Sequence, residues 1–219
     1  MRLVLASASP ARLSVLRSAG IEPIVMVSEV DEDALIADLG PDAAPEHVVT
    51  ELARAKAHDV SARVAAAGHS DVVIVGCDSM LSIGGELQGK PGTVDRARDR
   101  WKSMAGRSAS LLTGHCVIRT RRGRVDREAA ECSGTVVHFA SPSEADLEAY
   151  LASSEPLKVA GAFTLDSLGG WFVERIDGDP SSVIGIGLPL VRRLLDTVGV
   201  GIAELWADSP TDRNLDLRF

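Results

Sequence analysis

The sequence predicts a mixed α/β fold, and three observations indicate it. Apolar runs and helical apolar patterns alternate in the first half of the chain, two β-rich stretches meet at a tight turn in the middle, and helical patterns return in the last third. The composition, with 45% hydrophobic and 25% charged residues, is ordinary for a soluble globular protein. We therefore expect a single domain over residues 1–219, with a mixed sheet, an antiparallel hairpin region and two lobes around a central cleft.

The chain opens on a strand that leads directly into a helix. The apolar run at residues 3–5 is followed by Ser9, a candidate N-cap, and by Pro10 at the first helical position. The junction combines a helix start with the hydroxyls of Ser7 and Ser9 and the guanidinium of Arg12. These groups suit phosphate or another anion, although a capped helix after an edge strand explains the same pattern.

The remaining elements are predicted from apolar periodicity and turn residues. In chain order they are a strand at 24–27, a loop reaching Pro45, a helix at about 46–67, a strand at 71–75, a helix at 94–104, a hairpin at 108–139 turning at Arg122-Gly123, a helix at 143–152, a strand at 171–173 and a helix at 188–198.

Charge and cysteine content exclude several classes of protein. The net charge of -8 makes extended nucleic-acid binding unfavourable, and an arginine cluster around Gly123 fits a solvated hairpin tip. No run approaches the roughly 18 apolar residues that cross a membrane. Three widely spaced cysteines without a Cys-x-x-Cys pair indicate reduced thiols, so we expect a cytoplasmic protein. From the net charge and the lack of a long apolar run, we expect no nucleic-acid or membrane partner.

The helix at 46–67 carries a lysine on its apolar face. Val49, Leu52, Lys56 and Val60 follow one another at spacings of three, four and four, which places them on one side of a helix. A lysine in that position either extends to the rim of the apolar surface or points into a cleft toward an anion.

Two further polar residues follow the strand at 71–75. Asp78 comes after Gly76-Cys77, so its carboxylate is expected at the carboxyl end of a strand, where α/β sheets commonly place their sites, unless it is an ordinary turn aspartate. Lys90 lies in the rigid turn Gly89-Lys90-Pro91-Gly92, where an exposed lysine with no ligand is the simpler interpretation.

An acidic cluster after the second strand supplies a candidate metal ligand. It contains Glu29, Asp31, Glu32 and Asp33, and a solvated loop accounts for most of it. A carboxylate pair drawn from Glu32 and Asp78 is suited to a magnesium ion on a phosphate chain. Together with the helix start and the two lysines, this pair is the inventory needed to hydrolyse a phosphoanhydride.

Taken in order, these residues resemble the Maf family of nucleoside triphosphate pyrophosphatases. The shared pieces are Leu-Ala-Ser-Ala-Ser-Pro-Ala-Arg from Leu5, Leu-Ala-Arg-Ala-Lys-Ala from Leu52, Gly76-Cys77-Asp78-Ser79, Gly89-Lys90-Pro91, Gly106-Arg107, Thr113-Gly114, Glu155-Pro156, Ala160-Gly161 and Gly187-Leu188-Pro189. The resemblance implies an α/β fold with a cleft between two lobes, similar to the house-cleaning inosine triphosphate pyrophosphatases, and a homodimer.

The resemblance also implies the activity and the roles of several residues. The reaction is the Mg²⁺- or Mn²⁺-dependent cleavage of a nucleoside triphosphate, non-standard or surplus, to the monophosphate and pyrophosphate. Asp78 matches the family's proposed proton acceptor. The matching polar cleft residues are Ser7, Ser9, Arg12, Glu32, Lys56 and Lys90.

Some positions depart from the family pattern. Ala11 replaces the usual first arginine after Ser-Pro, Ser79 replaces the threonine after the aspartate, and Asp166 stands where many members carry glutamine. We assign Ser79 and Asp166 to substrate binding. An ionised Asp166 only accepts hydrogen bonds, so if it faces the base it favours guanine-type or modified purine nucleotides over pyrimidines. The alternatives are a nucleotide-binding regulator of cell division or septum formation with little turnover, and a phosphatase that releases orthophosphate.

Overall fold

One mixed sheet organises the computed structural model, which describes residues 1–208. Its strands follow the order β2-β1-β3-β5-β6-β7, and β4 pairs with β3 outside this path. The strands are β1 (Arg2–Leu5), β2 (Ile24–Val25), β3 (Val72–Ile83), β4 (Glu86–Gln88), β5 (Ser108–Arg121), β6 (Arg124–Phe139) and β7 (Val173–Asp177).

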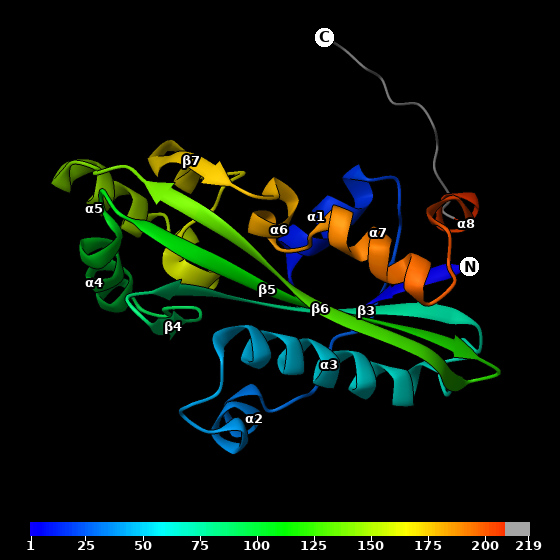
Figure 1. Ribbon diagram of the computed structural model, residues 1–219. Coiled ribbons are helices and arrows are strands. Elements are labelled where there is room, and N and C mark those ends of the chain that lie inside the picture. Colours follow the sequence, from blue (N-terminus) through cyan, green and yellow to red (C-terminus); the bar gives the residue numbers. More distant parts are fainter. Residues whose placement is uncertain (209–219) are drawn as a thin grey trace, which may run out of the picture.

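Helices cover both faces of this sheet. They are α1 (Pro10–Ser18), α2 (Glu32–Leu39), α3 (Pro45–Val64), α4 (Val94–Met104), α5 (Glu144–Ala152), α6 (Pro180–Ile184), α7 (Leu188–Thr197) and α8 (Ile202–Ala207), with 3₁₀ turns η1 (Glu155–Lys158), η2 (Ala160–Ala162) and η3 (Leu168–Phe172). Figure 1 shows α3 along one face, α1 and α7 along the other, and α4 and α5 beside one end of the long β5–β6 hairpin. Within residues 1–208, no helix has the length and apolar character needed to cross a membrane.

Three apolar clusters hold these layers together. An aliphatic cluster joins the sheet to α1, α7 and α8, and a second joins it to α3. The third, at the end of the sheet beside α4 and α5, contains most of the aromatic side chains, among them Trp101, Phe139 and Tyr150. The two ends of the sheet are thus packed with different side chains.

Strand β3 connects the parallel and antiparallel parts of the sheet. It runs parallel to β1 up to the pair Leu5 and Val75, and beyond that point it continues antiparallel to β5, with Asp78 opposite Gly114. The prediction that this strand ends at residue 75 was therefore wrong. Asp78 lies inside the longer strand but directly beyond the end of the parallel pairing, because β5 keeps the backbone of β3 hydrogen-bonded.

Two glycines let helix α3 approach the sheet closely. A Cβ atom at Gly76 would overlap the carbonyl oxygen of Ala53, and one at Gly114 would overlap that of Val49. Because the two strands are neighbours, these gaps form one shallow seat under the middle of α3.

Most of the other predicted elements are confirmed, with two corrections. The α/β class, the hairpin turning at Arg122-Gly123 and the helices near 46–67, 94–104, 143–152 and 188–198 are all present. The predicted loop before Pro45 contains α2, whose N-cap Asp31 accepts a hydrogen bond from the amide of Ala34 and whose first turn is acidic. The predicted strand at 171–173 is mostly the 3₁₀ turn η3, and the strand begins only at Val173.

Candidate active site

The start of α1 builds the first wall of the site. Ser9 is the N-cap, and its hydroxyl accepts a hydrogen bond from the amide of Arg12 at 3.4 Å. The Ser7 hydroxyl accepts one from the amide of Ser9 at 3.2 Å and another from the Arg12 guanidinium at 3.0 Å. Both described partners of Ser7 are donors, so its own proton is free to donate to a ligand oxygen.

Arg12 is a half-buried cation held only by neutral groups. Its Nε donates to the carbonyl of Gly185 at 2.9 Å, and its two terminal nitrogens donate to Ser7 at 3.0 Å and to Ser79 at 3.3 Å. Within residues 1–208, no carboxylate pairs with it. A guanidinium fixed in this way without a counter-ion is suited to bind an anion.

Lys56 lies between two carboxylates. Its Nζ is 2.6 Å from Asp78 Oδ1 and 2.8 Å from Glu32 Oε1. The side chains of Lys56 and Asp78 are only 8% and 9% exposed, whereas Glu32, at the first position of α2, is 48% exposed. Of the two interpretations offered by the sequence, the structure therefore supports the inward-pointing lysine, because its ammonium is buried against Asp78.

Glu32 and Asp78, the two predicted metal ligands, both contact the ammonium of Lys56. Both carboxylates already lie within hydrogen-bond reach of a positive charge, and carboxylate oxygens are the ligands that Mg²⁺ prefers. The part of the chain that the structure describes holds no group of three or more His, Cys, Asp or Glu residues able to bind a metal. A pair of carboxylates fits an ion that completes its coordination with substrate phosphates and water.

A chain of hydroxyls connects Arg12 to the interior. Ser79 accepts from Arg12 and lies 3.1 Å from the hydroxyl of Thr113, which in turn donates to the carbonyl of Ser182 at 3.3 Å. Thr113 was singled out only as part of a family motif, although it is fully buried here. The carbonyl of Gly185 was missed altogether, because a backbone acceptor has no signature in the side-chain sequence.

His115 is a second buried polar residue that sequence reasoning missed. Its Nδ1 lies 3.0 Å from the carbonyl of Thr113, and its Nε2 lies 2.8 Å from the amide of Gly187, which can only donate. These partners fix a neutral imidazole with the proton on Nδ1. Burial and the nearby charge of Arg12 lower the pKa of His115 to about 4, so the ring links β5 to the start of α7 without carrying charge.

Cys77 lies between the site residues but is not a nucleophile. Burial raises the pKa of its thiol to about 11, and the positive charges of Arg12 and Lys56 offset this only in part. The thiol therefore stays protonated near neutral pH and acts as a core side chain.

The other two predicted binding residues, Lys90 and Asp166, form no hydrogen bond or ion pair with this cluster within the described residues. Both are exposed, and none of the described contacts joins them to Asp78. The turn that carries Lys90 is held by the amide of Gly161, which donates to Gly89, and by the amide of Gly92, which donates to Leu157. Both residues thus belong to the region around η1 and η2.

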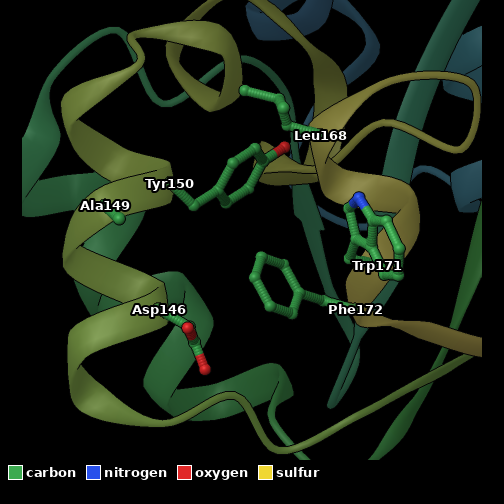
Figure 2. A pocket seen from close by; sticks show the side chains of 6 residues that line it. All are labelled: Asp146, Ala149, Tyr150, Leu168, Trp171 and Phe172. Atoms are coloured by element: carbon green, nitrogen blue, oxygen red, sulfur yellow. The ribbon is translucent and has the colours of Figure 1, made fainter.

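A surface hollow of about 440 Å³ is lined by residues of α5 and η3. Figure 2 shows Tyr150 and Phe172 between the ribbons of α5 and η3, with Leu168 and Trp171 on the η3 side. None of the residues around Asp78 lines it.

Comparison with known proteins places these observations in a family. The family model described as "Maf-like protein" matches residues 2–198. A protein of Rhodococcus opacus (strain B4) called "Nucleoside triphosphate pyrophosphatase" is 77% identical over 206 residues, which cover 94% of this chain and 96% of that protein. Proteins with the same name from Rhodococcus jostii (strain RHA1) and Mycobacterium marinum (strain ATCC BAA-535 / M) are 76% and 57% identical, covering 94% and 95% of this chain and 96% and 98% of their own lengths. The chain belongs to the Maf family.

Proposed function

We propose that this protein is a nucleoside triphosphate pyrophosphatase, which hydrolyses a nucleoside triphosphate to the monophosphate and pyrophosphate. The observation that carries the proposal is the buried Asp78 carboxylate, which is ion-paired with Lys56. The next residue, Ser79, accepts a hydrogen bond from the guanidinium of Arg12, which pairs with no carboxylate of the described chain. A carboxylate and cations in one place suit the activation of water beside a polyphosphate. The relatives reported above carry the corresponding name.

In the proposed reaction, Asp78 accepts a proton from water while the water oxygen attacks the α-phosphorus. The bond between the α-phosphorus and the oxygen that bridges to the β-phosphate breaks, and its electron pair leaves with pyrophosphate. Arg12 and the Ser7 and Ser9 hydroxyls bind phosphate oxygens at the amino end of α1, where the helix dipole favours negative charge. Lys56 and Lys90 neutralise the rest of the triphosphate.

We further propose that Glu32 and Asp78 hold a divalent cation, Mg²⁺ or Mn²⁺, together with the substrate. Such an ion would neutralise charge on the phosphate chain. The Lys56 ammonium contacts one oxygen of Glu32 and one oxygen of Asp78. Binding of the ion between these carboxylates would therefore require the ammonium to turn toward the phosphates.

The finer assignments follow from the resemblance and the charge. We propose non-standard or surplus nucleotides as substrates, a cytoplasmic location, a homodimer, and no nucleic-acid partner in view of the net charge of -8.

Product analysis tests the function directly. The purified protein is incubated with a panel of nucleoside triphosphates and MgCl₂ or MnCl₂, and the nucleotides, pyrophosphate and orthophosphate are separated. Equal amounts of monophosphate and pyrophosphate are expected. Diphosphate with orthophosphate would identify a phosphatase instead, and tight nucleotide binding without turnover would favour the regulatory alternative.

A further inference from the structure

The carboxylate of Glu155 organises the loop that carries Asp166. Its Oε1 accepts from the Thr164 hydroxyl at 2.5 Å and from the amide of Gly169 at 3.0 Å. Its Oε2 accepts from the Ser167 hydroxyl at 2.7 Å and from the amide of Leu168 at 3.3 Å. One side chain thus satisfies four donors within six consecutive residues.

Glu155 is charged, and its described partners are all neutral. Burial alone would raise its pKa, but the hydrogen bonds from Thr164, Ser167, Gly169 and Leu168 prevail and lower it. No lysine or arginine of the described chain forms an ion pair with it. The charge of Glu155 is thus stabilised by hydrogen bonds alone.

The loop is packed tightly on its inner side. A Cβ atom at Gly169 would approach the amide of Thr164 and the hydroxyl of Tyr150 to 2.5 Å, and one at Gly170 would approach the carbonyl of Leu165 to 2.6 Å. Asp166 is exposed, and none of the hydrogen bonds above involves its side chain. The backbone of the loop is therefore fixed while the Asp166 carboxylate stays free to meet a ligand.

The segment that bears Glu155 also supports the other exposed binding residue. Glu155 begins η1, and within η1 the carbonyl of Leu157 accepts from the amide of Gly92, two residues beyond Lys90. The amide of Gly161, which follows η1, donates to Gly89 on the other side of that lysine. The turn of Lys90 and the loop of Asp166 are thus held by one short stretch of chain.

We propose that Glu155 is a positioning residue for nucleobase selectivity, which fixes the loop at 164–169 so that Asp166 meets the base edge of the substrate. The inference rests on the proposed function. A base with adjacent N–H donors, as in guanine, matches the free carboxylate, whereas the carbonyl oxygens of uracil and thymine do not. Glu155 itself touches no reacting atom and acts through Asp166.

The test is steady-state kinetics of Glu155→Gln with GTP, 7-methyl-GTP, dTTP and UTP. A neutral amide replaces one acceptor oxygen with a donor that faces other donors, so the loop loses its fixed shape. We expect the kcat/KM ratio of guanine nucleotides over pyrimidine nucleotides to fall about tenfold, mainly through KM. The kcat for dTTP should change less than about twofold, because the substitution does not alter the cluster of Glu32, Lys56 and Asp78.

Three further variants make the result decisive. Glu174→Gln, at an exposed glutamate of β7, is the matched control and should keep the selectivity of the unaltered protein. Ser167→Ala removes one donor to Glu155 and should give a smaller shift in the same direction, which serves if Glu155→Gln does not fold. In an Asp166→Asn background, Glu155→Gln should change the selectivity no further.

Each contrary result has its own meaning. An equal loss of kcat/KM for all four nucleotides in both Glu155→Gln and Ser167→Ala, or a selectivity shift that adds to that of Asp166→Asn, would overturn the proposal. So would hydrolysis by the unaltered protein without any base preference, although the proposed function would then stand. Failure of the unaltered protein to hydrolyse any nucleotide would instead remove the proposed function.

Discussion

The cluster of Glu32, Lys56 and Asp78 and the loop that carries Asp166 balance the charge of their carboxylates in opposite ways. Around Asp78, a buried lysine bridges two carboxylates, so charge is balanced by charge. Around Asp166, the Glu155 carboxylate is balanced only by hydroxyls and backbone amides. An ion-paired cluster fixed between a helix and a strand suits chemistry common to every substrate, whereas a loop shaped by hydrogen bonds suits discrimination among substrates.

The apolar side chains that pack next to the two regions also differ in kind. The clusters next to α1, α3 and α7 are aliphatic. Behind the Asp166 loop, Trp101 makes edge-to-face contacts with Phe139, Tyr150 and Phe172 at centroid separations of 5.7, 6.0 and 5.7 Å. Its indole nitrogen also donates to the carbonyl of Ala162 at 2.8 Å. Such directional aromatic contacts give a firm base to a segment that lacks regular secondary structure.

The same chemical change at the two aspartates gives the largest contrast. Asp78→Asn should lower kcat at least about 100-fold with every nucleotide, because the proton acceptor is lost. Asp166→Asn, the matched control, should leave kcat with pyrimidine nucleotides nearly unchanged. Turnover of the two variants, with circular dichroism to verify folding, decides this, and near-normal turnover of folded Asp78→Asn would refute the assignment.

Acid should destabilise the protein through His115. The pKa of His115 is about 4 in the folded protein and 6.5 in the unfolded chain. Between pH 6.5 and pH 4, the unfolded chain therefore binds a proton at this residue that the folded protein does not bind. The stabilisation is complete above pH 6.5 and is lost as the pH falls toward 4, with about 2 kcal/mol lost by pH 5. Urea unfolding at pH 8 and pH 5 measures it. His115→Gln should be less stable at pH 8 but lose less on acidification, whereas the exposed control His47→Gln should behave as the unaltered protein; an unchanged pH dependence in His115→Gln would exclude this origin.

The two lysines should respond differently to salt. Lys56→Ala and Lys90→Ala are each expected to lower kcat/KM for a triphosphate about tenfold, since each removes a positive charge from the anion. The exposed Lys90 is screened by ions and the buried Lys56 much less, so Lys90→Ala should reduce the salt dependence of KM more. Kinetics from 50 mM to 500 mM KCl compare them, and a lysine whose removal changes nothing at any salt concentration does not bind the triphosphate.

The smallest expected effect concerns base choice alone. Asp166→Gln should shift the kcat/KM ratio toward dTTP and UTP about fivefold, because an amide both donates and accepts hydrogen bonds. Parallel measurements with GTP and 7-methyl-GTP give the ratio. A clear pyrimidine preference in the unaltered protein would show that Asp166 does not interact with the base in this way.

The sequence was sufficient for the parts of the site that depend on local periodicity. The spacing of Val49, Leu52, Lys56 and Val60 placed a lysine on the buried face of a helix, and the Ser9-Pro10 pair placed a helix start. The pairing of Lys56 with Asp78 was not predictable from spacing, because it depends on which strand α3 packs against. The helix that bears Glu32 escaped notice because it is only eight residues long and follows an acidic cluster that is typical of a loop; its apolar residues Leu35, Ile36 and Leu39 are only half-buried. The division into two lobes around a cleft and the likeness to inosine triphosphate pyrophosphatases stay predictions.

The glycine seat under α3 has a consequence for ligands that compete with the substrate. The helix backbone rests directly on Gly76 and Gly114, so it cannot sink further into the sheet, and the position of Lys56 follows from main-chain contact. Helix α2, which packs against α3 on the side away from the sheet (Figure 1), buries none of its residues and reaches the site through Glu32. An inhibitor with a bulky group beside Asp78 should therefore be accommodated by displacement of α2, and its affinity should depend on the sequence of α2 more than on that of α3.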